Sequence, residues 1–384
     1  MLRITDTAAV ETQFDGEELL LLIPAPLHVH DTRRSRAKIE IWGDDEPTIR
    51  WHVTATAAYA DDPDAVMADF QRRLTCETED VPAEIDEAEK LAKSFRFRHS
   101  DTDALVDECL RKLRDPSIPT LSLTPPERGP VGGHVEWDGV VIRLPRNVAL
   151  TVLSTEPVSV RDSRGELTVL AGGDVSVRDV GGPLAIAVSG GGVEARDVNG
   201  SARIVSRTMT GNTRLSSSGL VWMTRMNVSH ALGGGRCTPP HQLHSPAGID
   251  IRGVSGDLRA ETDWSDMVIW DVRGDIHAGN VRGDISLALT REYIDSDRRA
   301  AVSADHGDIH LSLEPSQDPS IRLETDFGIF DIRGEEVREQ FVTHNLADAP
   351  LYVATARRED LPDPRVRVET VAGSIYVRQG SMAG

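Results

Sequence analysis

The chain is poor in cysteine and in aromatic residues. Its 384 residues include three cysteines, far apart in the sequence, at Cys76, Cys109 and Cys237. An odd number of scattered cysteines does not form a disulfide framework, and the first ten residues lack the basic segment and apolar run of an export signal. We therefore expect a reducing, cytoplasmic environment. Aromatic residues make up 4% of the chain, a composition that favours a narrow core of Val, Ile, Leu and Ala.

Long apolar runs and basic charge are also scarce. The longest apolar stretch, Leu19–Ile23, ends at Pro24 and is far shorter than the roughly 20 residues that cross a bilayer. The 62 acidic residues outnumber the 42 basic ones, which gives a formal net charge of −20. Such a charge repels phosphate backbones and anionic lipid surfaces. The sequence therefore predicts no membrane insertion and no nucleic-acid partner.

The chain contains an internal repeat of 18 residues. Val175–Gly192 and Val193–Thr210 superpose at this offset, with Val, Arg, Asp and Gly recurring at matching positions. The same offset returns between Val254–Leu258 and Val272–Ile276. A unit of this length without a helix does not fit leucine-rich or ankyrin repeats, so it predicts a repeat built from strands.

Within each unit apolar and polar residues alternate, as in Leu184–Val188, Ile285–Leu289 and Ile309–Leu313. This period of two places one face of a strand in the core and the other in water. Glycine, aspartate and asparagine separate the strands, as expected at turns. We expect a mainly β protein, a parallel β-solenoid of about 18 residues per coil with three short strands in each coil and coils about 4.8 Å apart. A β-sandwich or meander with chance Gly-Asp corners is the alternative.

The N-terminal part and the linker that follows it differ from the repeats. Residues 1–60 predict strands that join the solenoid, including a hairpin formed by residues 37–42 and 48–53 around a Gly-Asp-Asp-Glu-Pro turn. Residues 115–138 are rich in proline, which predicts a linker or an extended crossing segment.

Between these two parts, residues 61–114 predict a small helical insertion. Apolar residues recur at helical spacing after Asp62, over Ala83–Phe95 and after Asp101, and the opposite faces are charged. Such amphipathic helices must cover an apolar surface. We expect them to pack on each other or across the open end of the solenoid.

Residues 139–384 form the predicted solenoid repeat domain. Loop insertions interrupt it at residues 227–247 and 335–364, and the second includes a possible short helix at its start. Insertions at the corners of repeat proteins often gather on the face that binds a partner. These loops are therefore the candidate binding surface of a monomeric interaction platform.

The repeat region resembles a known family. An apolar strand, a Leu-Pro step and a second strand at Val141–Val152 precede the serial Gly-Asp-Ile units, and Ile39–Asp45 leads into another strand. This pattern resembles the bacterial "putative adhesin" family of β-strand-repeat proteins, a domain of unknown function, and is similar to bactofilin-like β-solenoids. The resemblance implies a right-handed, single-stranded, largely parallel β-solenoid without established catalytic residues.

One group of residues predicts a metal site. Cys237, His241 and His244 are spaced as C-x3-H-x2-H within the longest loop. Zinc accepts such ligands, although structural zinc sites use four ligands and paired short spacings. A solvated polar loop is the alternative. We otherwise expect no cofactor.

Five aspartates stand at predicted corners, and each follows a glycine. A ladder of stacked carboxylates could bind calcium, but the spaced glycines of calcium-binding β-rolls are absent. Aspartate at a corner more commonly accepts hydrogen bonds from the backbone. The five residues are Asp174, Asp257, Asp275, Asp284 and Asp308.

A carbohydrate-active β-helix enzyme is a further alternative. Asp263, Asp266 and Asp271 lie close together in the sequence, and aromatic residues stand nearby. Their spacing fits no catalytic motif, and no Ser-His-Asp pattern, phosphate loop or dinucleotide fingerprint occurs. The aromatic residues are Trp222, Trp264, Trp270, Tyr293 and Tyr352.

We therefore expect a non-enzymatic, cytoplasmic scaffold that oligomerises or polymerises through the ends of a solenoid. A solenoid ends in strands with unpaired backbone groups, which can pair with another copy. The last strands of the sequence are the predicted self-association edge, at Val366, Val368, Ile375 and Val377. Another protein bound through the long loops is the alternative partner.

Overall fold

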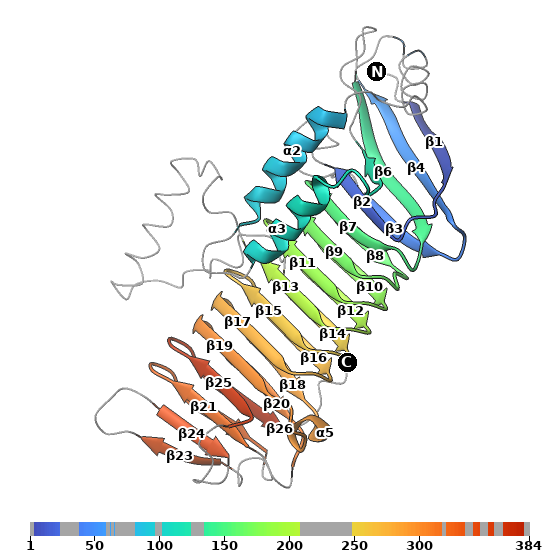
Figure 1. Cartoon of the computed structure of the whole chain (residues 1–384). Coiled ribbons are helices and arrows are strands. Elements are labelled where there is room, and N and C mark those ends of the chain that lie inside the picture. Colours follow the sequence, from blue (N-terminus) through green and yellow to red (C-terminus); the bar gives the residue numbers. More distant parts are fainter. Residues whose placement is uncertain are drawn as a thin grey trace, which may run out of the picture.

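The computed structural model shows an elongated, mainly β protein made of two large, mostly parallel sheets (Figure 1). Each sheet has 13 strands. The structure describes residues 4–23, 38–58, 62, 65, 81–96, 102–123, 134–207, 248–316, 320–334, 341–345, 352–356 and 364–379.

In the middle of the molecule the chain alternates between the two sheets. Sheet A contains β8 (Val158–Arg161), β10 (Val175–Val180), β12 (Val193–Val198), β14 (Ile249–Val254), β16 (Met267–Val272), β18 (Ile285–Leu289) and β20 (Ile309–Leu313). Sheet B contains β7 (Ala149–Ser154), β9 (Leu167–Ala171), β11 (Leu184–Val188), β13 (Ala202–Ser206), β15 (Leu258–Thr262), β17 (Ile276–Arg282) and β19 (Ala300–His306). All neighbours in these two series are parallel.

The 18-residue repeat corresponds to the strand register of this stack, in which paired residues are 18 positions apart in the sequence. Val175 pairs with Val193 in sheet A, and Leu184 pairs with Ala202 in sheet B. Each repeat therefore contributes one strand to each sheet, two strands in place of the expected three. The reason lies inside the sheet A strands, where an aspartate such as Asp179 or Asp197 adopts a left-handed conformation (φ 56° and 55°) and bends the strand without ending it.

The core lies between the sheets and follows the predicted alternation. Inward side chains such as Val177, Ile186, Ala195 and Ile204 are almost fully buried, and they belong to one continuous apolar cluster that runs through the stack. Most of the residues in this core are Val, Ile, Leu and Ala.

Six strands extend the N-terminal end of the stack. They are β1 (Ile4–Gln13), β2 (Glu18–Ile23), β3 (Lys38–Asp44), β4 (Thr48–Ala58), β5 (Thr120–Ser122) and β6 (His134–Pro145). The expected hairpin of β3 and β4 is wrong, because β6 lies between them, parallel to β3 and antiparallel to β4. Val140 and Ile142 of β6 point into the core and continue its apolar column. The proline-rich segment thus holds β5 and the start of β6.

Two helices cover the outer face of sheet B. Helix α2 (Val81–Ser94) and helix α3 (Thr102–Leu113) lie along the side of the stack (Figure 1). They pack on each other and on outward leucines of sheet B, such as Leu153 and Leu170. Of the two expected placements, packing on each other is confirmed, whereas the apolar surface that the helices cover lies on the side of the stack and not across its open end. The helix expected after Asp62 falls almost entirely outside the described residues.

At the C-terminal end the chain folds back on itself. Strands β25 (Val366–Thr370) and β26 (Ile375–Gln379) insert beneath β21 (Ile321–Thr325) and β22 (Phe330–Arg333), which precede them in the sequence. The segment 335–364, expected as a loop, contains β23 (Phe341–Asn345) and β24 (Tyr352–Ala356), which extend sheet B. A short helix, α5 (Arg291–Ile294), fills one corner.

This fold-back overturns the predicted self-association edge. β25 lies between β19 and β21, and β26 lies between β20 and β22. The four predicted edge residues are consequently in the core, each 2% exposed or less: Val366, Val368, Ile375 and Val377. Position at the end of a sequence does not place a strand at the end of a stack.

Candidate functional site

The predicted zinc ligands Cys237, His241 and His244 lie outside the described residues. Within the part of the chain that is described, no group of three or more His, Cys, Asp or Glu side chains is placed to hold a metal ion. Cys109 lies on the buried face of helix α3, and this burial raises the pKa of its thiol to about 12, so the thiol stays protonated.

The five corner aspartates join successive coils. Each accepts a hydrogen bond at Oδ1 from a backbone N–H of the next coil, for example from Asp275 to Asp257 at 2.9 Å and from Asp308 to Asp284 at 2.9 Å. The same contact links Gly192 to Asp174 and Ser374 to Asp308. Asp275 receives it from Arg299. These carboxylates therefore form part of the stack, as the structural interpretation of the sequence predicts.

The acids proposed for an enzyme have separate structural roles. Asp263 forms an ion pair with Arg207, and burial raises the pKa of this carboxyl group while Arg207 opposes the rise. Asp266 accepts the backbone N–H of Asp284 at 2.9 Å. Asp271 occupies a left-handed bend of β16. The structure does not bring the three together as an acid–base pair.

The described aromatic candidates also belong to the scaffold. Trp264 and Trp270 lie against the guanidinium groups of Arg282 and Arg252, at 4.4 and 5.2 Å from the ring centres. Tyr293 is buried and donates its hydroxyl to the carbonyl of Arg299 at 2.7 Å. Trp222 and the side chain of Tyr352 lie outside the described part of the chain.

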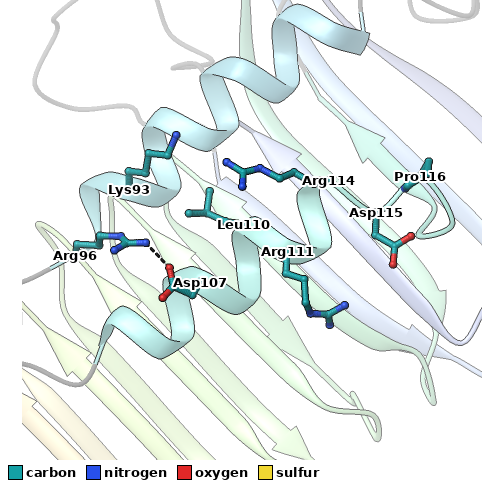
Figure 2. Close-up of a pocket in the computed structure, with 8 residues that line it drawn as sticks. All are labelled: Lys93, Arg96, Asp107, Leu110, Arg111, Arg114, Asp115 and Pro116. Carbon is teal, nitrogen blue, oxygen red and sulfur yellow. Dashed lines mark hydrogen bonds and ion pairs between the residues drawn. The ribbon is translucent and has the colours of Figure 1, made fainter.

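A hollow of about 640 Å³ lies where α2 and α3 meet (Figure 2). Each of the four cationic side chains that line it forms an ion pair. Arg114 and Lys93 both bind Glu89, at 2.7 and 2.8 Å, and these contacts lower the pKa of Glu89 to about 2. Arg96 pairs with Asp107, as the dashed line in Figure 2 shows, and Arg111 pairs with Glu108. Of these pairs, Arg114–Glu89 and Arg96–Asp107 join the two helical segments, and all four leave little charge for a ligand.

A second hollow, of about 540 Å³, crosses the outer face of sheet B beyond the helices. Arg203, Arg259 and His277 line it from three neighbouring strands and stand in register. Arg259 is paired with Glu261 at 3.0 Å. Asp257 and Asp275 also line this groove, which runs across the strands, so it offers an elongated ligand charges of both signs.

The ends of the two sheets carry a further candidate surface, made of edge strands and exposed apolar side chains. Among the described strands, β22 pairs only with β26, and β23 pairs only with β24. Beside β22 lie the exposed large apolar side chains of the described structure, Phe327 (71% exposed), Ile329 (63%) and Val371 (43%). We call these three residues the terminal corner cluster; its two chain segments are joined by the Phe327 N–H to the Val371 carbonyl at 3.1 Å.

The sequence marks this cluster through the large apolar residues that it places at a corner. Many other corners of the stack carry small or polar residues such as Gly-Asp, whereas this corner reads Phe327-Gly328-Ile329. Two large apolar residues at a turn have no core to enter. No sequence pattern marks the fold-back that makes this the last corner. The fold-back depends on the insertion of β25 and β26 beneath β21 and β22.

Comparisons with known proteins add little to this description. No family model and no curated protein matches the chain. One solved structure, described as "a putative cell adhesion protein from Clostridium sporogenes ATCC 15579", covers 98% of this chain and 100% of its own length at 9% identity and a TM-score of 0.17. A likeness this low carries no argument. The similarity to adhesin-like and bactofilin-like proteins therefore rests on the sequence pattern alone.

Proposed function

We propose that this protein is a non-enzymatic β-solenoid scaffold that self-associates through the ends of its sheets. The alternation of strands between two parallel sheets supports a solenoid. A right-handed winding follows from the strong preference of parallel strands for right-handed crossovers. The described residues include no helix long and apolar enough to cross a membrane.

The terminal corner cluster is the observation that carries this proposal. Exposed apolar side chains scattered singly are ordinary, but three that adjoin an edge strand form a site for contact with another protein surface. The backbone groups on the free side of β22 can pair with a further strand. Burial of both features in one contact would remove apolar surface from water and satisfy the backbone groups.

The runner-up is a monomeric platform that uses the groove lined by Arg203, Arg259 and His277. Its basic residues stand beside Asp257 and Asp275, and this mixture of charges across several strands supports an elongated polar partner. A polysaccharide lyase or hydrolase has less support, because the described candidate carboxylates are bonded within the scaffold.

Replacement of the cluster tests the scaffold proposal. We expect the wild-type protein to show a mean mass that rises with concentration in sedimentation velocity. The double variant Phe327→Lys/Ile329→Lys should stay monomeric, because two charges cannot be buried unpaired in a contact. Ser303→Lys is the matched control, since Ser303 is exposed on β19, an interior strand. A wild-type protein that is monomeric at every concentration would contradict the proposal.

A further inference from the structure

At each end of the stack one sheet extends one strand further than the other, and a different sheet does so at each end. Consecutive strands β8 and β9 mark one coil, and β18 and β19 mark another. On the N-terminal side of the first coil, sheet A has four further strands (β3, β6, β4 and β1) and sheet B has three (β7, β2 and β5). On the C-terminal side of the second coil, sheet A has three (β20, β26 and β22) and sheet B has four (β25, β21, β24 and β23). Sheet A thus projects by one strand at the N-terminal end, and sheet B projects by one at the C-terminal end.

The outermost strands of each sheet run parallel to the strands in the middle of that sheet. β1 is antiparallel to β4, and β4 is antiparallel to β6, so β1 runs the same way as β6 and the rest of sheet A. β23 is antiparallel to β24, which is antiparallel to β21, so β23 runs with sheet B. β22 and β5 are parallel to their neighbours. Each sheet consequently begins and ends with strands of one direction.

We propose that copies of this chain stack head to tail, with β1 of one copy beside β22 of the next and β5 beside β23. This inference rests on the proposed self-association and names its geometry. The projecting strand β1 fills the place that sheet A leaves open opposite β23, so both sheets continue from one copy into the next. All the new pairs are parallel, as in the stack itself, and extend its spacing of about 4.8 Å.

An inverted contact between two C-terminal ends matches the steps in one arrangement only. If sheet A of each copy continued into sheet A of the other, the projecting β23 strands would have to occupy places already filled in sheet B. Only an arrangement in which sheet A of one copy continues into sheet B of the other avoids this overlap. Head-to-tail stacking is heterologous, so it produces an open filament.

The charges at the two ends agree with this arrangement. β1 carries Asp6 and Glu11 and no basic residue, and Glu11 is paired with Arg50 of the neighbouring strand β4 at 3.2 Å. At the other end Arg333 of β22 stands beside Arg378 of β26, and Asp331 is bonded to Arg333 at 2.6 Å, which leaves a net positive charge. Opposite charges on two surfaces favour their encounter and their register.

Two variants, each with one end of the stack blocked by proline, test the head-to-tail arrangement. The Ile375 N–H donates to the Ile329 carbonyl, so, because strand residues alternate, the N–H of Ile332 points to the free edge. Ile332→Pro removes that group from an edge strand, where proline is tolerated, and blocks the C-terminal end. Adjacent residues of β1 point their N–H groups to opposite sides, so one of Thr7→Pro and Ala8→Pro blocks the N-terminal end; the variant that keeps the wild-type melting temperature is used.

Each blocked variant alone should be monomeric, and an equimolar mixture should give a dimer of one copy of each by sedimentation velocity. Association of the N-terminally blocked variant by itself, with no change on mixing, would overturn head-to-tail stacking in favour of a closed C-terminal dimer while leaving self-association intact. A monomeric wild-type protein would instead overturn self-association itself. If Ile332→Pro lowers the melting temperature, Phe327→Lys/Ile329→Lys serves as the C-terminally blocked partner.

Discussion

At the scale of single residues, aspartate has two structural roles in this chain. At the corners its carboxylate accepts a backbone N–H from the next coil, as Asp284 does from Asp308. Within sheet A strands it adopts the left-handed conformation, as Asp197 does with φ 55°, a place that Gly253 takes in the next coil. Both roles explain why acidic residues recur at fixed spacing without forming a metal site or a catalytic pair.

Loss of a corner carboxylate should weaken the stack. Asp284→Ala leaves the Asp308 N–H without its protein acceptor, so we expect the free energy of unfolding to fall by about 1 kcal/mol. Asp284→Asn keeps an oxygen at the same place and should cost less. The midpoint of urea unfolding, followed by circular dichroism, measures both. Equal midpoints for Asp284→Ala and the wild type would show that the corner bond contributes nothing.

Most glycines at the corners act through close approach rather than through φ. A Cβ atom on Gly274 would lie 2.3 Å from the carbonyl carbon of Gly256 in the coil beside it. The described glycines with positive φ are Gly253, Gly283 and Gly334. The sequence pattern thus marks the corners correctly, but the physical reason for most of these glycines is the short distance between stacked backbones.

At the scale of elements, the helical insertion shows what periodicity can and cannot predict. The spacing of Ile85, Ala88, Ala92 and Phe95 places a helix where α2 forms, and Ala88, Ala92 and Phe95 are fully buried. The surface that these residues cover depends on outward leucines of sheet B, which a pattern of inward alternation does not single out. Helix existence was predictable, and its position on the side of the stack was not.

The ion pairs of Glu89 should make the helical layer sensitive to acid. Arg114 and Lys93 hold the pKa of Glu89 near 2 in place of 4.5. Because the folded-state pKa is the lower one, this stabilisation is present above about pH 4.5 and is lost as the pH falls toward 2. Glu89→Gln should therefore lower the melting temperature at pH 7, and the difference from the wild type should shrink near pH 2. A difference that does not change with pH would assign the effect to packing.

Strand pairing is a second property of the elements that the sequence pattern does not predict. The strands β3 and β4 are visible in the sequence, but β6, about 80 residues further on, separates them. A short turn between two strands favours a hairpin locally. Here the apolar residues of β6 and the parallel neighbours available on both sides decide the pairing.

At the scale of the whole molecule, the repeat predicts the stack but not its ends. An 18-residue offset fixes the register between neighbouring coils, so the middle of both sheets follows directly from the sequence. The ends depend on antiparallel strands and on the fold-back of β25 and β26, which share no repeat. The predicted edge residues, such as Val368 and Ile375, were wrong for this reason, and the terminal corner cluster takes their place as the proposed contact surface.

Negative-stain electron microscopy over a range of protein concentration shows directly whether copies of the chain join through the sheet ends. We expect rods joined end to end along a common axis, longer at higher concentration. We also expect single short rods for Phe327→Lys/Ile329→Lys. Isolated rods of one length at every concentration of the wild-type protein would contradict self-association through the sheet ends.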